Sequence, residues 1–176
     1  LSRFRHSDSA QHIAESSINQ ILQLWTPTTG WNRQRLEREL GLRVIDSTFI
    51  VGLARALGPL VKFYRTTHYA PALQLALLLK EKLTNEFFLA DGSYNRESFG
   101  THSHSTTCVM SSLAQLAELL HDAPLIERVR AFYDNGLWQI RDALGWVVEM
   151  SGDDADPDKV RAIDRQPRRP QHDSEK

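Results

Sequence analysis

Apolar residues recur every three or four positions along most of the chain, which is the spacing of amphipathic helices. The segments with this period cover residues 13–25, 33–42, 49–64, 72–88, 106–120 and 125–133, with a further turn or two over 137–144. Only residues 145–149 have the character of a short extended piece. The pattern therefore predicts an all-α fold built from an array of antiparallel helical hairpins.

Short turns that contain proline divide the helices into pairs. Pro71 and Pro124 each lie near the start of a helical segment. Backbone N–H groups in the first turn make no hydrogen bond within the helix, so the missing N–H of proline costs nothing there. Pro59 lies in the middle of an apolar segment, so we expect a kink or two helices there. Two hairpins result, over about residues 49–88 and 106–144, and they share this order of elements and no further motif.

One long segment between the two hairpins has no helical period. It runs from Ala90 to Ser105 and is rich in small, polar and aromatic residues. A loop of this length is uncommon in a compact helical domain unless it carries a function. The loop contains His102 and His104, whose side chains would point to the same side of an extended chain.

The composition indicates one folded domain followed by a polar tail. Hydrophobic residues make up 41% of the chain, with four Trp and seven Phe, which is enough for a substantial core. Residues 1–150 form the predicted helical-hairpin domain. Residues 151–176 are rich in Asp, Arg and Pro and have almost no large apolar side chains, so we expect them to be flexible.

Charge and cysteine content exclude several kinds of partner and site. The formal net charge is −1, which gives no attraction to nucleic acid or to an anionic membrane, and no apolar run is long enough to span a bilayer. The single cysteine, Cys108, can form neither an intrachain disulfide nor a Cys-based zinc site. It starts an apolar helical pattern, so we expect it to be buried. We assign no cofactor and no metal, and we expect no nucleic-acid or membrane partner.

Several stretches resemble the inner and outer helices of an α/α toroid. They are residues 45–51, 60–65, 102–117, 131–137 and 145–149. Over residues 45 to 149 the chain is similar to the six-hairpin glycosidase superfamily, which includes many carbohydrate-active hydrolases and some polysaccharide lyases. The resemblance implies a toroid-like array of hairpins and a carbohydrate ligand, while the activity depends on the particular site residues.

The number of hairpins predicts a partial or truncated ring. A ring of six hairpins of this length needs about 300 residues or more. The chain has 176 residues, with two clear hairpins and an incomplete third near the N-terminus. An open array exposes apolar faces that a closed ring would bury, so we also expect self-association through exposed helix faces.

The candidate catalytic residues are His102, His104, Asp46 and Glu149. Histidine titrates near neutral pH and is suited to proton transfer, to polar contacts with a substrate, or to hydrogen bonds that cap the following helix. A metal site would need a third ligand, and no carboxylate here has diagnostic spacing. Asp46 and Glu149 are candidates for the paired carboxylates of glycoside hydrolysis. The simpler interpretations are an N-cap for Asp46 and an exposed position for Glu149.

The candidate substrate-binding residues are Tyr94, Arg96, Phe99 and Trp146. Aromatic rings bury the apolar faces of sugars well, and these aromatics are close in sequence to the loop or to the extended piece. Phe99 and Trp146 are equally suited to filling the core. Tyr94, beside Asn95 and Arg96, is the stronger candidate for a ligand contact.

Two functions of different classes remain open. The first is a carbohydrate-active toroid-type protein that binds or cleaves a polysaccharide or oligosaccharide, as a glycoside hydrolase or a lyase does. The second is a non-catalytic helical-hairpin module that binds a protein. A helical terpenoid cyclase is less well supported, because no Asp-rich metal motif lies on a predicted helix. An enzyme should gather both histidines and two carboxylates in one pocket, whereas an interaction module should present an apolar or charged groove.

Overall fold

The computed structural model describes residues 7–41, 49–50, 52–93 and 102–137, and this part of the chain is almost entirely helical. The helices are α2 (Asp8–Leu24), α3 (Arg33–Leu40), α4 (Leu57–Thr67), α5 (Ala70–Lys82), α7 (Ser103–Leu120) and α8 (Ala123–Ala131). A 3-10 turn, η1 (Leu53–Ala56), precedes α4, and π-helical turns end two hairpins, η2 (Leu83–Phe87) after α5 and η3 (Phe132–Gly136) after α8. The all-α prediction is confirmed. The predicted tail, residues 151–176, lies outside the described residues.

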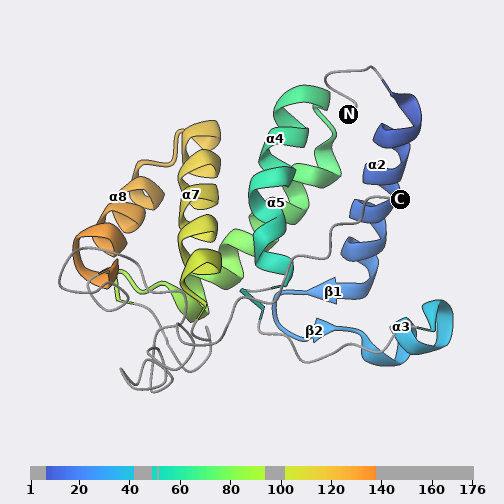
Figure 1. Cartoon of the computed structure of the whole chain (residues 1–176), viewed down its shortest axis with the longest axis horizontal. Coiled ribbons are helices and arrows are strands. Elements are labelled where there is room, and N and C mark those ends of the chain that lie inside the picture. Colours follow the sequence, from blue (N-terminus) through green and yellow to red (C-terminus); the bar gives the residue numbers. More distant parts are fainter. Residues whose placement is uncertain (1–6, 42–48, 51, 94–101, 138–176) are drawn as a thin grey trace, which may run out of the picture.

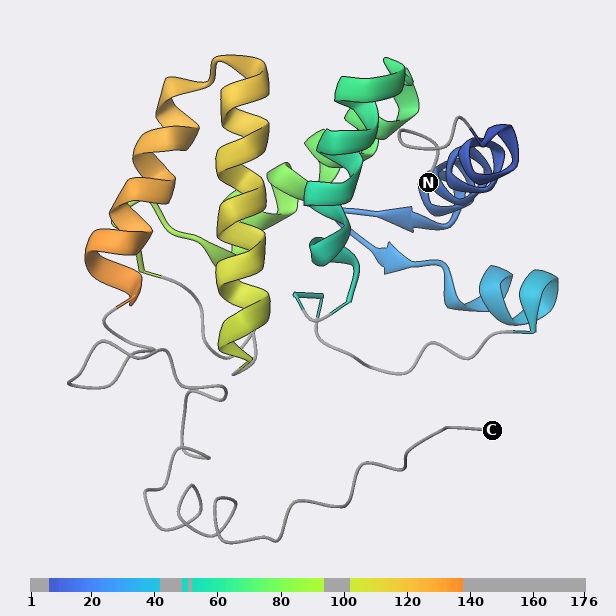
Figure 2. The ribbon, with the colours of Figure 1, turned by 45° about the horizontal axis from the view of Figure 1, so that its top comes forward.

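The helices form two antiparallel hairpins, α4–α5 and α7–α8, which pack side by side (Figure 1). The first helix of one hairpin, α4, packs against the first helix of the other, α7. On the far side of the array, α2 packs against α5. Figure 2 shows the α7–α8 hairpin at one end of this row and α2 at the other.

Both hairpins reverse direction through the same kind of turn. His68 ends α4 and His121 ends α7, and each has a left-handed backbone with φ of 55° and 52°. Each histidine is followed by one residue outside the helix and then by Ala-Pro, which places proline in the first turn of the next helix. The shared motif, His-X-Ala-Pro over 68–71 and 121–124, shows that the expectation of no common motif was wrong.

The contact between α4 and α7 depends on small residues. Gly58 is buried in the first turn of α4, and a methyl group there would lie 2.7 Å from the Ser112 hydroxyl of α7. Pro59 follows Gly58 within this first turn, where its missing donor interrupts no hydrogen bond. The apolar segment is thus divided into η1 and α4, which is the two-helix alternative expected from Pro59.

The exposed face of α7 contradicts one prediction. Cys108 is exposed, whereas Val109, Met110, Leu113 and Leu116 of the same helix are buried. The apolar pattern begins at Val109, one residue after the cysteine, and a step of one residue turns the side chain by about 100° around a helix. Cys108 therefore points away from the core.

The two π-helical turns lie at one end of the array and are joined by close contacts. The Arg128 guanidinium donates to the carbonyl oxygens of Thr84 and Phe88 at 2.6 and 3.0 Å, and the Phe88 and Phe132 rings meet edge to face at 5.4 Å. The turn Asp91–Ser93 packs on η3, where the Asn135 amide donates to the Asp91 carbonyl at 2.8 Å. These contacts fix where the chain leaves the first hairpin.

The N-terminal part adds a small ribbon and a short helix. Strands β1 (Trp25–Thr26) and β2 (Gly30–Trp31) pair antiparallel around the predicted helix stop. The aromatic rings of Trp25, Phe49 and Phe87 stack in sequence at centroid distances of 5.8 and 5.4 Å. Lys82 caps this stack by donating to the Pro27 carbonyl at 2.8 Å and lying 5.6 Å from the Phe49 ring centre. The ribbon is thereby held against the end of α5.

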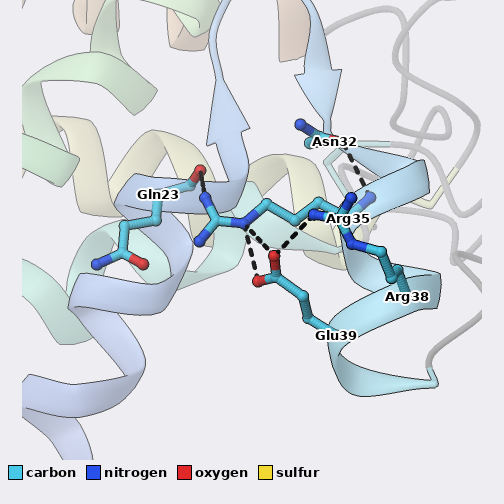
Figure 3. A network of polar contacts seen from close by, with 5 residues as sticks. All are labelled: Gln23, Asn32, Arg35, Arg38 and Glu39. Atoms are coloured by element: carbon cyan, nitrogen blue, oxygen red, sulfur yellow. Dashed lines mark hydrogen bonds and ion pairs between the residues drawn. The ribbon is translucent and has the colours of Figure 1, made fainter.

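Helix α3 is held to the end of α2 by the polar network in Figure 3. The Arg35 guanidinium donates to both carboxylate oxygens of Glu39 at 2.9 and 2.8 Å and to the Gln23 carbonyl at 3.4 Å, while the Asn32 side chain caps the helix. Hydrogen bonds from Arg35 and then Arg38 hold the pKa of Glu39 below its usual range. Because these side chains are exposed, we expect the pairs to contribute little to stability.

Substitution of Gly92 should destabilise the fold strongly. Gly92 has φ of 88°, and a methyl group there would overlap the Ala131 carbonyl. We expect Gly92→Ala to lower the free energy of unfolding by about 2 kcal/mol or more, measured by urea denaturation. Gly41→Ala is the matched control, because Gly41 has φ of 62° and open space around its Cα. It should cost only about 1 kcal/mol, from the left-handed backbone alone. Equal losses would contradict a role for close packing at Gly92.

The pairing of Asp122 with Lys80 should make the stability of the fold depend on pH in the acidic range. The carboxylate caps α8 by accepting from the Leu125 amide at 3.0 Å and pairs with the Lys80 ammonium at 2.7 Å. The Lys80 hydrogen bond, followed by the Leu125 hydrogen bond, holds the pKa of Asp122 below its ordinary value of 3.8. A carboxyl whose pKa is lower in the folded state stabilises the fold above its unfolded pKa, and this contribution is lost as the pH falls through the folded pKa.

We therefore expect wild type to be more stable than Asp122→Asn at neutral pH and to lose this advantage in acid. Asparagine keeps the capping acceptor but cannot carry the charge. The measurement is the free energy of unfolding of both proteins from pH 7 to about pH 2.5. A difference that stays constant over this range would show that the charge of Asp122 is not the cause.

Candidate functional site

His102 caps the N-terminus of α7. Its backbone is extended, with φ of −81° and ψ of 95°, and its Nδ1 accepts a hydrogen bond from the Ser105 amide at 3.2 Å. The Ser105 hydroxyl lies 3.0 Å from the same nitrogen. One of the three interpretations of the histidines, a helix cap, is thus confirmed for His102. The hydrogen bonds also fix the orientation of the imidazole and leave Nε2 as the nitrogen that can meet a ligand.

His104 is close to His102 but is not part of an extended loop. Helix α7 begins at Ser103, so His104 lies in its first turn and is exposed. The two ring centres are 5.9 Å apart and the rings meet edge to face. The expectation that an extended chain brings the side chains to one side was wrong, although the rings are neighbours. Ser and Thr dominate this first turn, and their weak helical signal hid the start of the helix.

The first turn of α7 also contains a buried hydroxyl that has no partner. Ser103 is 1% exposed, and among the buried side chains that the structure describes its Oγ alone lacks a hydrogen bond. Leaving a buried hydroxyl unpaired costs about 1–3 kcal/mol. Unpaired polar atoms of this kind are uncommon in folded proteins. Ser103 was not among the predicted site residues, and the sequence gives no signal that separates it from its serine neighbours.

The remaining predicted site residues are not placed by the structure. The carboxylates Asp46 and Glu149 lie outside the described residues. So do the four predicted substrate-binding residues, Tyr94, Arg96, Phe99 and Trp146. The structure thus brings together His102 and His104 and leaves the other six candidates as predictions. Within the described ranges, no three His, Cys, Asp or Glu side chains lie close enough to hold a metal ion.

A polar strip runs along the solvent side of α7, beginning at His104. It continues at helical spacing through Cys108, Ser111, Gln115 and Glu118, of which only Gln115 is partly buried. A second exposed strip follows η1 and α4, through Arg55, Pro59, Lys62 and Thr66. Because α4 packs against α7, the strips approach each other, and their polar spacing is a signal that could have been found in the sequence.

A groove of about 530 Å³ lies where these strips meet. Its lining residues are Lys62, Arg65, Thr66 and Gln115, and we call it the α4–α7 groove. The Arg65 guanidinium spans it, donating to the Gln115 carbonyl at 3.2 Å and to the Glu118 carboxylate at 2.8 Å. The Arg65 hydrogen bond is the main cause that lowers the pKa of Glu118, which keeps that carboxylate ionised. Sequence patterns give no sign of this groove, because it is formed by two segments 50 residues apart.

The capping role of His102 predicts different stabilities for variants of the two histidines. His102→Ala removes the acceptor for the Ser105 amide and should cost about 1 kcal/mol, whereas His102→Asn should restore most of this loss. His104→Ala removes an exposed side chain and should change the free energy of unfolding by less than about 0.5 kcal/mol. Urea denaturation measures all three. Equal losses for the two alanine variants would contradict the cap.

Comparison with known proteins assigns the chain to no family. No family model matches it, and no curated protein and no solved structure is significantly similar to it. Within the described residues, none of the helices combines the length and the apolar character needed to cross a bilayer. The case for a function therefore depends on the residues and geometry described above.

Proposed function

We propose that this chain is a carbohydrate-active protein of the α/α-toroid type, a partial ring of helical hairpins that binds or cleaves a polysaccharide or oligosaccharide. The observation that carries the proposal is the repeated hairpin, in which two His-X-Ala-Pro turns reverse the chain and the first helices, α4 and α7, lie together. An inner layer of first helices is what the resemblance to six-hairpin glycosidases implies. The ligand site is expected at the N-terminal end of α7.

The end of the array at which α7 begins offers suitable chemistry. The ring of His104 is exposed and adjacent to His102, whose orientation is fixed by the Ser105 amide. An exposed imidazole can transfer a proton to or from a sugar oxygen. In this proposal Asp46 and Glu149 supply the carboxylates that glycoside hydrolysis requires. Tyr94, Arg96, Phe99 and Trp146 contact the sugar rings.

A panel of glycans tests the proposal directly. Thermal unfolding of the full chain is followed with neutral, amino and acidic oligosaccharides, and light scattering gives the mass in solution. A ligand that binds only the folded state, at a concentration of 100 times its dissociation constant, stabilises that state by about 2.7 kcal/mol. A clear rise in Tm is therefore expected for one glycan class. A chain that responds to none of these glycans would contradict the proposal.

Light scattering also tests the proposed self-association. Six large apolar side chains of the described part are exposed, among them Ile13 of α2 at 65% and Leu77 of α5 at 39%. They are distributed over several elements, so they support association without defining one face. A dimer or larger assembly is the expected result, and a monomer at all concentrations would contradict self-association.

The catalytic role of His104 has its own test. If a glycan in the panel is cleaved, His104→Ala is expected to abolish turnover and to leave the helical circular dichroism signal unchanged, because the side chain is exposed. Glu127→Gln on α8 is the control, since Glu127 is exposed and is not one of the proposed site residues. Full activity of His104→Ala would remove His104 from the acid–base chemistry.

One observation favours the second candidate, a helical-hairpin module that binds a protein without catalysis. Such a module should present a charged or apolar groove along its helices, and the α4–α7 groove is charged. The same groove also suits an acidic ligand of another class. Binding of an acidic peptide by a chain that ignores every glycan would support the second candidate.

A further inference from the structure

The α4–α7 groove combines two cations with neutral hydrogen-bonding groups. Lys62 and Arg65 provide the positive charge, and Glu118 beside Arg65 is the acidic group that faces it. In the described part of the chain, the Lys62 ammonium has no hydrogen-bond or ion-pair partner. The groove thus has a net positive charge and one cation that is free to pair with a ligand.

The polar groups of the groove are held in place before any ligand binds. The Thr66 hydroxyl donates to the Lys62 carbonyl at 2.9 Å, which leaves its oxygen as an acceptor, and the Gln115 amide nitrogen donates to the Ser111 carbonyl at 3.3 Å. The Arg65 guanidinium is anchored to α7 at two points. Groups that are already ordered lose less entropy on binding, which favours affinity.

We propose that the α4–α7 groove is a subsite for an acidic sugar, a unit of an oligosaccharide that carries a carboxylate or sulfate group. This inference rests on the proposed carbohydrate function and names the class of its substrate. The anionic group pairs with the Lys62 ammonium and with the Arg65 N–H groups that face the groove. Ring hydroxyls bind the Thr66 oxygen and the Gln115 amide. The volume of about 530 Å³ lies within the range of about 300–1,000 Å³ typical of small-ligand sites.

The lining favours an acidic sugar over a neutral sugar, a peptide or a nucleic acid. A neutral sugar is commonly held on an aromatic ring, and the four lining residues include none. Acidic peptide motifs are commonly bound by clusters of arginines, whereas this groove has one arginine, Arg65, which already pairs with Glu118. Nucleic-acid sites need a broad basic surface, and this chain has a formal net charge of −1.

The groove lies on the same face of α7 as His104. Gln115 follows His104 by eleven residues along the exposed strip, a distance of about 16 Å at the helical rise per residue. A single sugar cannot reach both positions. An extended acidic oligosaccharide that runs along the strip can contact the groove with one unit and the histidine pair with another, so affinity should rise with chain length.

The experiment measures binding of a tetrameric oligogalacturonide to the full chain by calorimetry at low salt. The variants Lys62→Gln and Arg65→Gln each remove one charge-assisted pairing and should weaken binding about tenfold. Lys62→Arg keeps the charge and should bind as wild type does. Arg130→Gln is the matched control, because Arg130 is an exposed arginine on α8 that pairs with Glu127 of the same helix and does not line the groove, so it should have no effect. Unfolding of each variant confirms that the fold is intact.

The comparison ligands separate this inference from the proposed function. A neutral cello-oligosaccharide of equal length should bind more weakly, and added salt should weaken binding of the acidic chain. Equal binding by Lys62→Gln, Arg65→Gln and wild type would overturn the groove and leave the carbohydrate function standing. The same holds if only the neutral sugar binds. Inorganic sulfate that binds as tightly as the oligogalacturonide would overturn recognition of a sugar. A poly-glutamate peptide that binds while every glycan fails would overturn both proposals.

Discussion

The close contact between α4 and α7 is the constraint on which the rest of the structure depends. Gly58 has no side chain where the Ser112 hydroxyl of α7 approaches, so the two helices can pack with little between them. The buried side chains around this contact, among them Leu57, Leu113 and Leu116, complete the core on both sides. Because each helix is the first of its hairpin, their contact sets the position of α5 and α8 as well. It also brings together the two polar strips that form the groove, which neither hairpin has alone.

The direction of the chain is set by two residues in an uncommon conformation. His68 and His121 adopt a left-handed backbone that is uncommon for residues other than glycine, and each ends a helix by donating its amide to a carbonyl of the preceding turn. In each turn a proline lies three residues after the histidine, in the first turn of the second helix. Its missing N–H interrupts no helical hydrogen bond there. Two reversals of the same kind bring both π-helical turns and the start of α7 to one end of the molecule (Figure 1). The loop ends are therefore gathered there by the geometry of the turns.

Helical periodicity predicted the elements well because it depends only on neighbouring residues. The junction of η1 and α4 just before Pro59, the proline in the first turn at Pro71 and the stop after Trp25 all follow from local backbone chemistry. The start of α7 was missed because its first turn is held by a histidine cap and a run of Ser and Thr, which are weak helix formers. Cys108 was misplaced because one residue decides whether a side chain faces the core. The groove could not be predicted, since the contact between Arg65 and Glu118 joins residues 53 positions apart.

The residues of the two polar strips contribute little to the stability of the fold. Stability alone therefore does not account for their charges. Exposed ion pairs such as Arg65 with Glu118 are worth about 0–1 kcal/mol, and an unpaired Lys62 stabilises nothing in the described part of the chain. The core of α4 and α7 lies on their opposite faces, so the fold tolerates almost any polar residue on the strips. The fold therefore does not explain a free ammonium beside an anchored guanidinium. The proposed acidic ligand would bring the pairing that Lys62 lacks and would share Arg65 with Glu118.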